Sequence, residues 1–379
     1  MSYPTNSIYS EHHRRTAKWI IDDDTRLVHM ELWLTPQEMV GLKLNETVWI
    51  DGRAYIINKI KDWDPKSDRL TKVELITAND TEIAAFAFGI LGGIVVEEGG
   101  YRYSIFTESD TLLIRGRNPL NVEYLVVGGG GPGGFQAGGA GGAGGLISGS
   151  ATLPIGNYEV TVGEGGIAST GNIPGTSDEP GQNGGFSRIL RNSGGFSFDF
   201  KAEGGGYGGN GTTTGNPASA YMQGADGGSG GGGGPGAASS ATETGGEGIP
   251  GQGNDGGLQF HSNTVNQRSG GGGGGASQPG TDGDSTTAGN GGNGSTWPIP
   301  ASIATEFEIG EVVGSDVYFA GGGAGGQQSG PASTAGLGGG GLSLMNGKPH
   351  SGGGAGGGMD TNKQGGNGGS GIVIVRHQI

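Results

Sequence analysis

Glycine is distributed very unevenly along this chain of 379 residues, and this constrains the fold more than any other feature. Residues 1–98 hold five of the 92 glycines, and the other 281 residues hold 87 of them. Collagen is similarly rich in glycine, but its glycine is strict at every third position and accompanied by abundant proline. Here the glycines occur in blocks, such as residues 128–131, and the chain has only 16 prolines. The sequence therefore excludes collagen and predicts two regions that fold by different means, joined near residue 99.

Overall composition excludes several classes of function. The formal net charge is −15, and no basic patch is available to neutralise phosphates, so we expect no nucleic-acid partner. The chain has no cysteine, which excludes disulfides and thiolate metal sites. Residues 1–15 lack the apolar core of a secretory signal. The longest apolar stretch, residues 83–96, is shorter than the ~20 residues that a membrane helix needs. It predicts a buried segment or a subunit interface, without membrane insertion.

Residues 1–98 have an ordinary composition and the pattern of a small β domain. Residues 48–50 and 53–57 are rich in strand-forming residues and flank Asp51-Gly52, a pair that favours a tight hairpin turn. Residues 70–76 alternate between apolar and polar side chains, which is typical of a strand with one buried face. We therefore predict a mostly β N-terminal module.

The glycine-rich region contains three strand-like runs: residues 124–127, 158–162 and 372–375. We expect them to form a clasp that holds the glycine segments, through the side chains of Tyr124, Val126, Val160, Ile372 and Ile374. If the first run pairs with the last, both ends of the glycine region lie together. The loops at the opposite end then project away.

The glycine segments themselves are predicted to be ordered. A flexible linker is the alternative for Gly/Ser-rich sequence, but the strand-like runs favour a folded domain. In the extended threefold helix each residue advances ~3.1 Å and its N–H and C=O groups point outward in three directions. Only glycine lets neighbouring chains approach on every side. Segments of similar length, suited to matched rods, are residues 128–134, 138–145, 204–209, 227–236, 270–276, 321–326, 338–341, 352–358 and 365–369.

The predicted fold is thus a mostly β module followed by a polyglycine-II-type helix bundle, which short β-strands clasp, with little α-helix. Its parts are an attachment or oligomerisation module (1–98), a connecting strand pair (99–121) and a glycine-rich domain with recognition loops (122–379).

The opening run 122–131, the following 144–146 and 158–163, and the closing run 368–376 together resemble the glycine-rich domain of phage tail fibres and some bacterial surface proteins. The resemblance covers roughly residues 101–379. It implies a polyglycine-helix bundle at the distal end of a phage adhesin, in contact with the host surface, and it carries no catalytic residues.

A shorter resemblance lies in the N-terminal module. Residues 57–65 and 70–75 are similar to a signature of tail-associated virion proteins from phages that infect Bacteroidetes. This resemblance implies that residues 1–98 attach the chain to other virion tail proteins.

Long, chemically varied inserts interrupt the glycine segments, and several place an aromatic ring beside polar groups. Rings stack on sugars or on protein surfaces while polar groups fix the orientation of the ligand. The alternative is that these rings pack on the flank of the bundle or between subunits. The candidate receptor contacts are Phe198, Tyr221, Phe260, His261, Trp297 and Tyr318.

No motif predicts chemistry. In a region this rich in glycine, Gly-x-Gly-x-x-Gly arises by chance, and Gly347-Lys348 is followed by proline where a phosphate loop needs Ser or Thr. Asp62, Asp64 and Asp68 lack the glycine and the final glutamate of a calcium loop. We therefore expect no enzyme, no catalytic residue, no cofactor and no metal.

The function that these observations favour is a virion tail or fibre protein that binds a glycan or protein on the host cell, acting outside the cell as a homo-oligomer, in our expectation a trimer. One alternative is a purely structural virion part, such as a tail tip, collar or head decoration. Another is a bacterial surface protein or an ice-binding protein, although the threonines are too sporadic for a regular ice-binding array.

Overall fold

The computed structural model divides into two compact units, Met1–Gly89 and Ile90–Ile379, which we describe separately. It describes residues 27–32, 39, 47–50, 53–61, 63–64, 70–77, 89–116, 118–169, 181–193, 196–211, 221–236, 244–261, 268–330, 332–360 and 363–379.

The division falls earlier than the boundary predicted at residue 98. The reason is that β6 (Ile94–Glu98) pairs with β7 (Tyr101–Phe106) inside the second unit. Residues 99–121 are likewise no separate connector, because their strands belong to the sheets of this unit. Of the apolar stretch 83–96, residues 83–88 lie outside the described residues. The rest packs within its own chain, since Ile90 is fully buried.

The described part of the first unit is a four-stranded antiparallel sheet in the order β1-β4-β3-β2. Its strands are β1 (Leu27–Leu32), β2 (Thr47–Ile50), β3 (Arg53–Lys61) and β4 (Thr71–Thr77). The predicted hairpin is confirmed, because Ile50 pairs with Arg53; its turn residues lie outside the described part. Alternate residues Tyr55, Ile57, Val73 and Leu75 are buried as the core of the sheet.

The second unit begins with two five-stranded sheets, ordered β10-β9-β19-β7-β6 and β13-β12-β11-β8-β5. Besides β6 and β7, their strands are β5 (Gly89–Leu91), β8 (Asp110–Arg115), β9 (Leu120–Val127), β10 (Leu146–Leu153), β11 (Gly156–Thr161), β12 (Ser187–Ser193), β13 (Phe196–Ala202) and β19 (Ile372–Gln378).

A smaller layer completes the sandwich. It consists of the helix α4 (Ala301–Glu306) and a three-stranded sheet of β16 (Ser295–Thr296), β18 (Asp316–Phe319) and β17 (Glu311–Val313). A two-stranded ladder, β14 (Phe260–His261) with β15 (Arg268–Ser269), lies apart from these sheets. The described residues are therefore mostly β, with almost no helix.

The strands β9 and β19 pair as the sequence predicted, with Ile372 opposite Val127 and Ile374 opposite Leu125. Their sheet is the middle layer, because successive residues contribute to different cores. Ile372 and Ile374 join the core shared with α4, whereas Val373 and Val375 join the core shared with the other five-stranded sheet. Burial on both faces explains why these runs are apolar without alternation. Val160, on β11, packs against this clasp from the opposing sheet rather than pairing with it.

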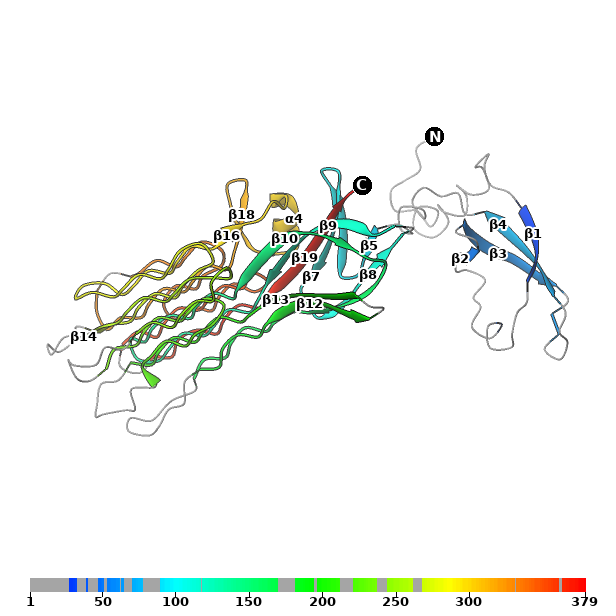
Figure 1. Cartoon of the computed structure of the whole chain (residues 1–379). Coiled ribbons are helices and arrows are strands. Elements are labelled where there is room, and N and C mark those ends of the chain that lie inside the picture. The colour runs from blue at the N-terminus through cyan, green and yellow to red at the C-terminus, as the bar shows by residue number, and fades with distance from the viewer. Residues whose placement is uncertain are drawn as a thin grey trace. The chain divides into compact units, whose positions relative to one another are not determined.

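The glycine segments run between this strand sandwich and the opposite end of the unit (Figure 1). Residues 128–134 leave β9, the chain turns at 135–137, and 138–145 return to β10. Residues 203–211 leave β13, and residues 363–371 enter β19. We call the end marked by the turn 135–137 the tip and the segments together the glycine bundle.

Segment 138–145 shows how the bundle is held. Its successive N–H groups donate to three other segments in rotation: Gly139, Ala140 and Gly141 donate to carbonyls of Gly209, Gly271 and Ala355. The cycle then repeats, as Gly142, Ala143 and Gly144 donate to Gly206, Gly274 and Gly352. The carbonyl groups of the same segment accept from 128–134, 229–232 and 323–326. Six segments therefore surround this one, each within backbone hydrogen-bonding distance.

Such close approach explains the glycine content. A Cβ atom on Gly139 would lie 1.9 Å from the carbonyl oxygen of Gly232, and one on Gly141 would lie 2.0 Å from that of Gly131. Both distances are far inside van der Waals contact. Alanine is present at the buried positions 140 and 143, which are three residues apart and so lie on the same side of an extended threefold helix.

On the outside of the bundle, amide and carboxylate side chains take the place of missing neighbours. The Asn367 Oδ1 atom accepts the N–H of Ala168 at 2.8 Å, and the Asn346 Oδ1 atom accepts the N–H of Asn367 at 2.8 Å. Asp255 and Asp282 accept backbone N–H groups of other segments in the same way. Backbone groups that no adjacent segment reaches are thus still paired.

Candidate functional site

The tip of the glycine bundle gathers the ends of several segments that are distant in sequence. Phe135 donates its N–H to the Asn210 side chain at 2.9 Å, and Asn210 donates its own N–H to the carbonyl of Tyr221 at 2.8 Å. Gln136 donates to the carbonyl of Lys363 at 3.0 Å. These hydrogen bonds thus join four separate parts of the chain at the tip.

A second set of contacts extends the tip. In the β14–β15 ladder, His261 lies opposite Arg268, and Ser269 forms a bridge with Gln327. Gln328 donates its N–H to the carbonyl of Arg268 at 3.1 Å, and Asp360 donates to that of Gln327 at 3.2 Å. Figure 1 shows β14 at the end of the bundle farthest from the sheets.

The turn 135–137 is a strained part of this end. Gln136 and Ala137 both have φ of 54°, in the left-handed region that side chains other than glycine seldom adopt. The hydrogen bond from Gln136 to the carbonyl of Lys363 holds this turn against a neighbouring segment. The described tip is therefore built on a rigid backbone.

His261 is the titratable group at the tip with the clearest chemical character. Both of its ring nitrogens are enclosed and have no hydrogen-bond partner in the described structure, and burial, followed by the nearby charge of Arg268, lowers its pKa. The Gln328 Oε1 atom is enclosed and equally unmatched. The lowered pKa favours the neutral imidazole, whose enclosed nitrogens are not accessible to a ligand in this arrangement.

The six predicted contacts divide between the two ends of the unit. Tyr221, Phe260 and His261 lie at the tip, each half-buried. Phe198 and Tyr318 lie at the sandwich end, on β13 and β18. The Phe198 ring packs 6.3 Å from the rings of Tyr158 and Phe200, so it covers the core between the two large sheets.

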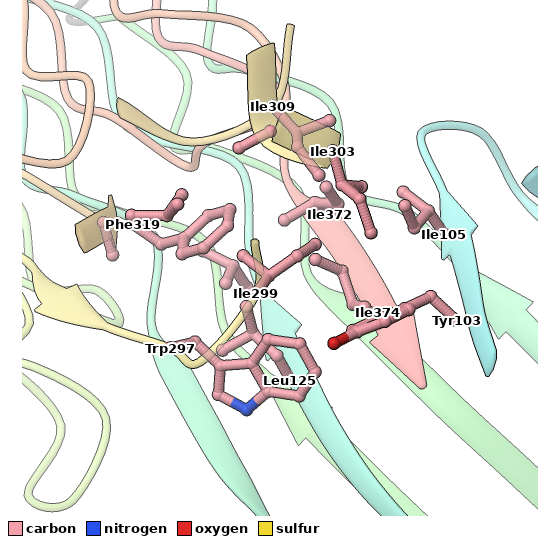
Figure 2. Packing of buried hydrophobic residues seen from close by; sticks show 14 of the residues in the cluster. Tyr103, Ile105, Leu125, Trp297, Ile299, Ile303, Ile309, Phe319, Ile372 and Ile374 are labelled. Atoms are coloured by element: carbon pink, nitrogen blue, oxygen red, sulfur yellow. The ribbon is translucent and has the colours of Figure 1, made fainter. Parts of the chain in front are cut away.

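The prediction for Trp297 is wrong. Its side chain is 6% exposed and packs among Leu125, Ile299 and Ile374 in the core beneath α4 (Figure 2). The guanidinium group of Arg376 lies 5.0 Å from the indole ring and donates to Glu123, which holds this face of the sandwich closed. Trp297 is thus a core residue, and the neighbouring polar residues gave no sign of this in the sequence.

Other polar residues at the tip were not predicted from the sequence: Gln136, Arg268, Gln328 and Asp360. They lie in different segments, and no motif links them. The only available signal was their position next to the inserts between glycine segments.

Neither a metal centre nor a membrane span emerges from the described residues. No group of three His, Cys, Asp or Glu side chains there is placed to hold a metal ion. None of the helical residues described form a helix with the length and hydropathy needed to cross a bilayer.

Comparison with known families matches residues 110–378 to the glycine-rich domain. The chain belongs to this family. The match covers the glycine bundle together with the strands from β8 to β19, so the glycine-rich domain includes the strand sandwich except β5, β6 and β7. None of the curated proteins compared with the chain matches it.

Proposed function

We propose that the segments of the glycine-rich domain are polyglycine-II-type helices packed as a bundle. The threefold rotation of hydrogen bonds along 138–145 supports this, because that helix has three residues per turn and no internal hydrogen bonds. The six surrounding segments fit hexagonal packing. A bundle of this kind resists bending, since the interior segments are tied to several neighbours by backbone hydrogen bonds.

We further propose that the chain is a phage virion tail or fibre protein that binds the surface of the host cell with the tip of its glycine-rich domain. The observation that carries this proposal is the gathering of segment ends at one end of the bundle, opposite the strand sandwich through which the chain enters and leaves the unit. The resemblance of residues 101–379 to the glycine-rich domain of tail fibres points the same way.

The chemistry of the tip favours a glycan or a polar protein surface as the ligand. Tyr221 and Phe260 are half-buried, and each supplies a ring that stacks on a sugar. We propose that residues 1–98 join the chain to other virion tail proteins, that the chain works as an oligomer on the particle, and that it needs no cofactor and performs no catalysis.

The test is adsorption of the fluorescently labelled full chain to cells of the bacterium that the encoding phage infects. We expect saturable binding that Tyr221→Ala together with Phe260→Ala reduces about tenfold or more, because the tip loses two stacking rings. Val313→Ala is the matched control, since Val313 is 41% exposed on β17, at the sandwich end of the unit.

Two results would count against the receptor role. Folded wild-type chain that does not adsorb, while immunogold labelling finds it on the particle, would favour a purely structural tail component. Absence of the chain from purified particles would reject the virion assignment altogether.

A further inference from the structure

The edge of the middle sheet is open along β10. Leu146 donates its N–H away from β9, to the carbonyl of Gln252 at 2.9 Å. Because the direction of hydrogen bonding alternates along a strand, the N–H and C=O groups of Ser148, Ser150 and Thr152 point the same way. None of these groups has a backbone partner within the described structure.

This edge also lacks the features that usually keep edge strands apart. Natural edges carry charges, prolines or bulges, or are very short. Among the other edge strands of the second unit, β13 carries Asp199 and Lys201, β6 carries Glu97 and Glu98, and β5, β16 and β17 have two or three residues. By contrast, β10 has eight residues, no charge and no proline, and Ser148, Gly149 and Ser150 are small and exposed.

The outward-pointing residues are arranged symmetrically about Ser150. In an antiparallel pair of two identical strands centred there, Ser150 faces Ser150, and Ser148 faces Thr152 twice. The main-chain groups of Ser148, Ser150 and Thr152 all point toward the second copy. Each of the three facing pairs therefore exchanges two main-chain hydrogen bonds, about six in total. Opposed Ser and Thr side chains add favourable cross-strand contacts. The main-chain bonds do not depend on the side chains, so the Ser–Ser and Ser–Thr pairs are what favour a second copy of β10 as the partner.

We propose that β10 is a self-association strand: two copies of the chain join edge to edge, antiparallel and centred on Ser150, into one continuous ten-stranded sheet. The arrangement is two-fold, in contrast to the trimer expected from the sequence. A polar hollow of about 420 Å³ lies beside the start of β10. Its walls are formed by Leu146–Ser148, Gly251–Asn254, Ala276, Ser277 and Ser295. Because Gln252 already occupies the place opposite Leu146, the paired region is residues 148–152 of both copies.

The register is tested with single cysteines, because the chain has none of its own. In the proposed pairing the two copies of residue 150 have Cα atoms about 5.5 Å apart, within the range that a disulfide spans. The two copies of residue 152 are offset by four residues, about 13 Å. Under mild oxidation of the full chain, Ser150→Cys should form a covalent dimer and Thr152→Cys should not.

The dimer itself is tested by sedimentation of the full chain at up to about 100 µM. We expect a dimer whose dissociation constant rises at least about tenfold in Ser150→Lys, because the pairing places the two lysines opposite each other. Ser197→Lys is the control, since it adds the same charge to an exposed position on the other long edge strand, β13. Circular dichroism establishes that each variant is folded.

The outcomes are distinct. The proposal is supported if Ser150→Lys weakens dimerisation and Ser197→Lys leaves it unchanged. It is also supported if the cysteine at residue 150 cross-links and the one at residue 152 does not. A wild-type chain that stays monomeric, a dimer that both lysine variants leave intact, or equal cross-linking at residues 150 and 152 would overturn it.

Discussion

In the strand sandwich, each strand forms hydrogen bonds with neighbours in the plane of one sheet, whereas segment 138–145 of the glycine bundle forms them with six segments around it. The sheets leave two faces for side chains, and Leu125 and Val126 fill one core each. The bundle has no such faces inside, because neighbouring backbones occupy the space of the side chains.

This difference separates two sources of stability within one unit. The sandwich gains its stability largely from burial of apolar surface, at roughly 25 cal/mol per Å². The bundle must order glycine, the residue that loses the most backbone freedom on folding, and offsets this cost with a dense set of hydrogen bonds. The two parts should therefore respond to opposite kinds of mutation. Adding side-chain atoms should destabilise the bundle, and removing side-chain atoms should destabilise the sandwich.

The largest effect is expected from adding one methyl group inside the bundle. Gly139→Ala places a Cβ atom 1.9 Å from the carbonyl oxygen of Gly232, so the two segments must separate and lose their hydrogen bonds. We expect the free energy of unfolding to fall by about 4 kcal/mol or more. Thermal unfolding followed by circular dichroism measures this change. The control is Gly185→Ala, whose Cβ would meet nothing closer than 3.0 Å. Equal stability of the two variants would contradict the account of the bundle.

The matching deletion in the sandwich comes next. Leu125 is fully buried in the core beneath α4, so Leu125→Ala should lower the free energy of unfolding by about 2–5 kcal/mol through lost burial and a cavity. Leu125→Met, which keeps the volume, should cost less than about 1.5 kcal/mol. In the bundle, the deletion Ala355→Gly should cost only about 1 kcal/mol. Denaturant titration of the three variants measures their free energies of unfolding. A larger decrease for Ala355→Gly than for Leu125→Ala would contradict the proposed difference between bundle and sandwich.

A smaller effect should distinguish the inside of the bundle from its surface. Asn210 is 7% exposed, and its side chain accepts the N–H of Phe135, so Asn210→Ala leaves a buried donor unmatched at a cost of about 1–3 kcal/mol. Asn346 makes the same kind of bond to the N–H of Asn367, and both of these residues are exposed. Water replaces the side chain in Asn346→Ala, which should change the stability by about 0.5 kcal/mol or less. Hydrogen exchange of the two freed N–H groups provides an independent readout.

The smallest effect concerns pH and should arise in the sandwich. His377 on β19 is 6% exposed, and burial, followed by the charge of Arg102, lowers its pKa below 6.5, whereas Glu97 acts in the opposite direction. The unfolded chain therefore binds a proton more readily than the folded one. Stability is complete above pH 6.5 and declines as the pH falls toward the folded pKa. We expect the melting temperature to drop by a few degrees between pH 7 and pH 5, and less so in His377→Gln. An identical drop in that variant would show that other groups are responsible.

The sequence predicted some strands well and others not at all. Residues 124–127 and 372–375 are runs of β-branched, aromatic and other apolar residues, and such runs predict strands that are buried on both faces. Strand β10 consists largely of Ser, Gly, Ala and Thr, and its place in the sheet depends on pairing with β9 rather than on propensity. The helix α4 was also missed, because its six residues follow a Pro-Ile-Pro run that reads as a turn.

The candidate contacts illustrate the same limit. Tyr221 and Trp297 both stand beside polar residues in inserts between glycine segments, and nothing local distinguishes them. The structure places Tyr221 at the tip and Trp297 in a core, because the position of each insert depends on which end of its segment it follows.

By itself, the sequence determined that most of this chain must be held together by its backbone, because a region with so few side chains has too little apolar surface for a conventional core. It also predicted the strands at the start and the end of the glycine-rich domain, because their apolar runs are stable only when they are buried. Only the tertiary structure decided which segments are neighbours, which inserts meet at the tip and which edge stays open. Glycine segments are nearly identical to one another, and so their order in the bundle follows from the lengths and contacts of the connections between them.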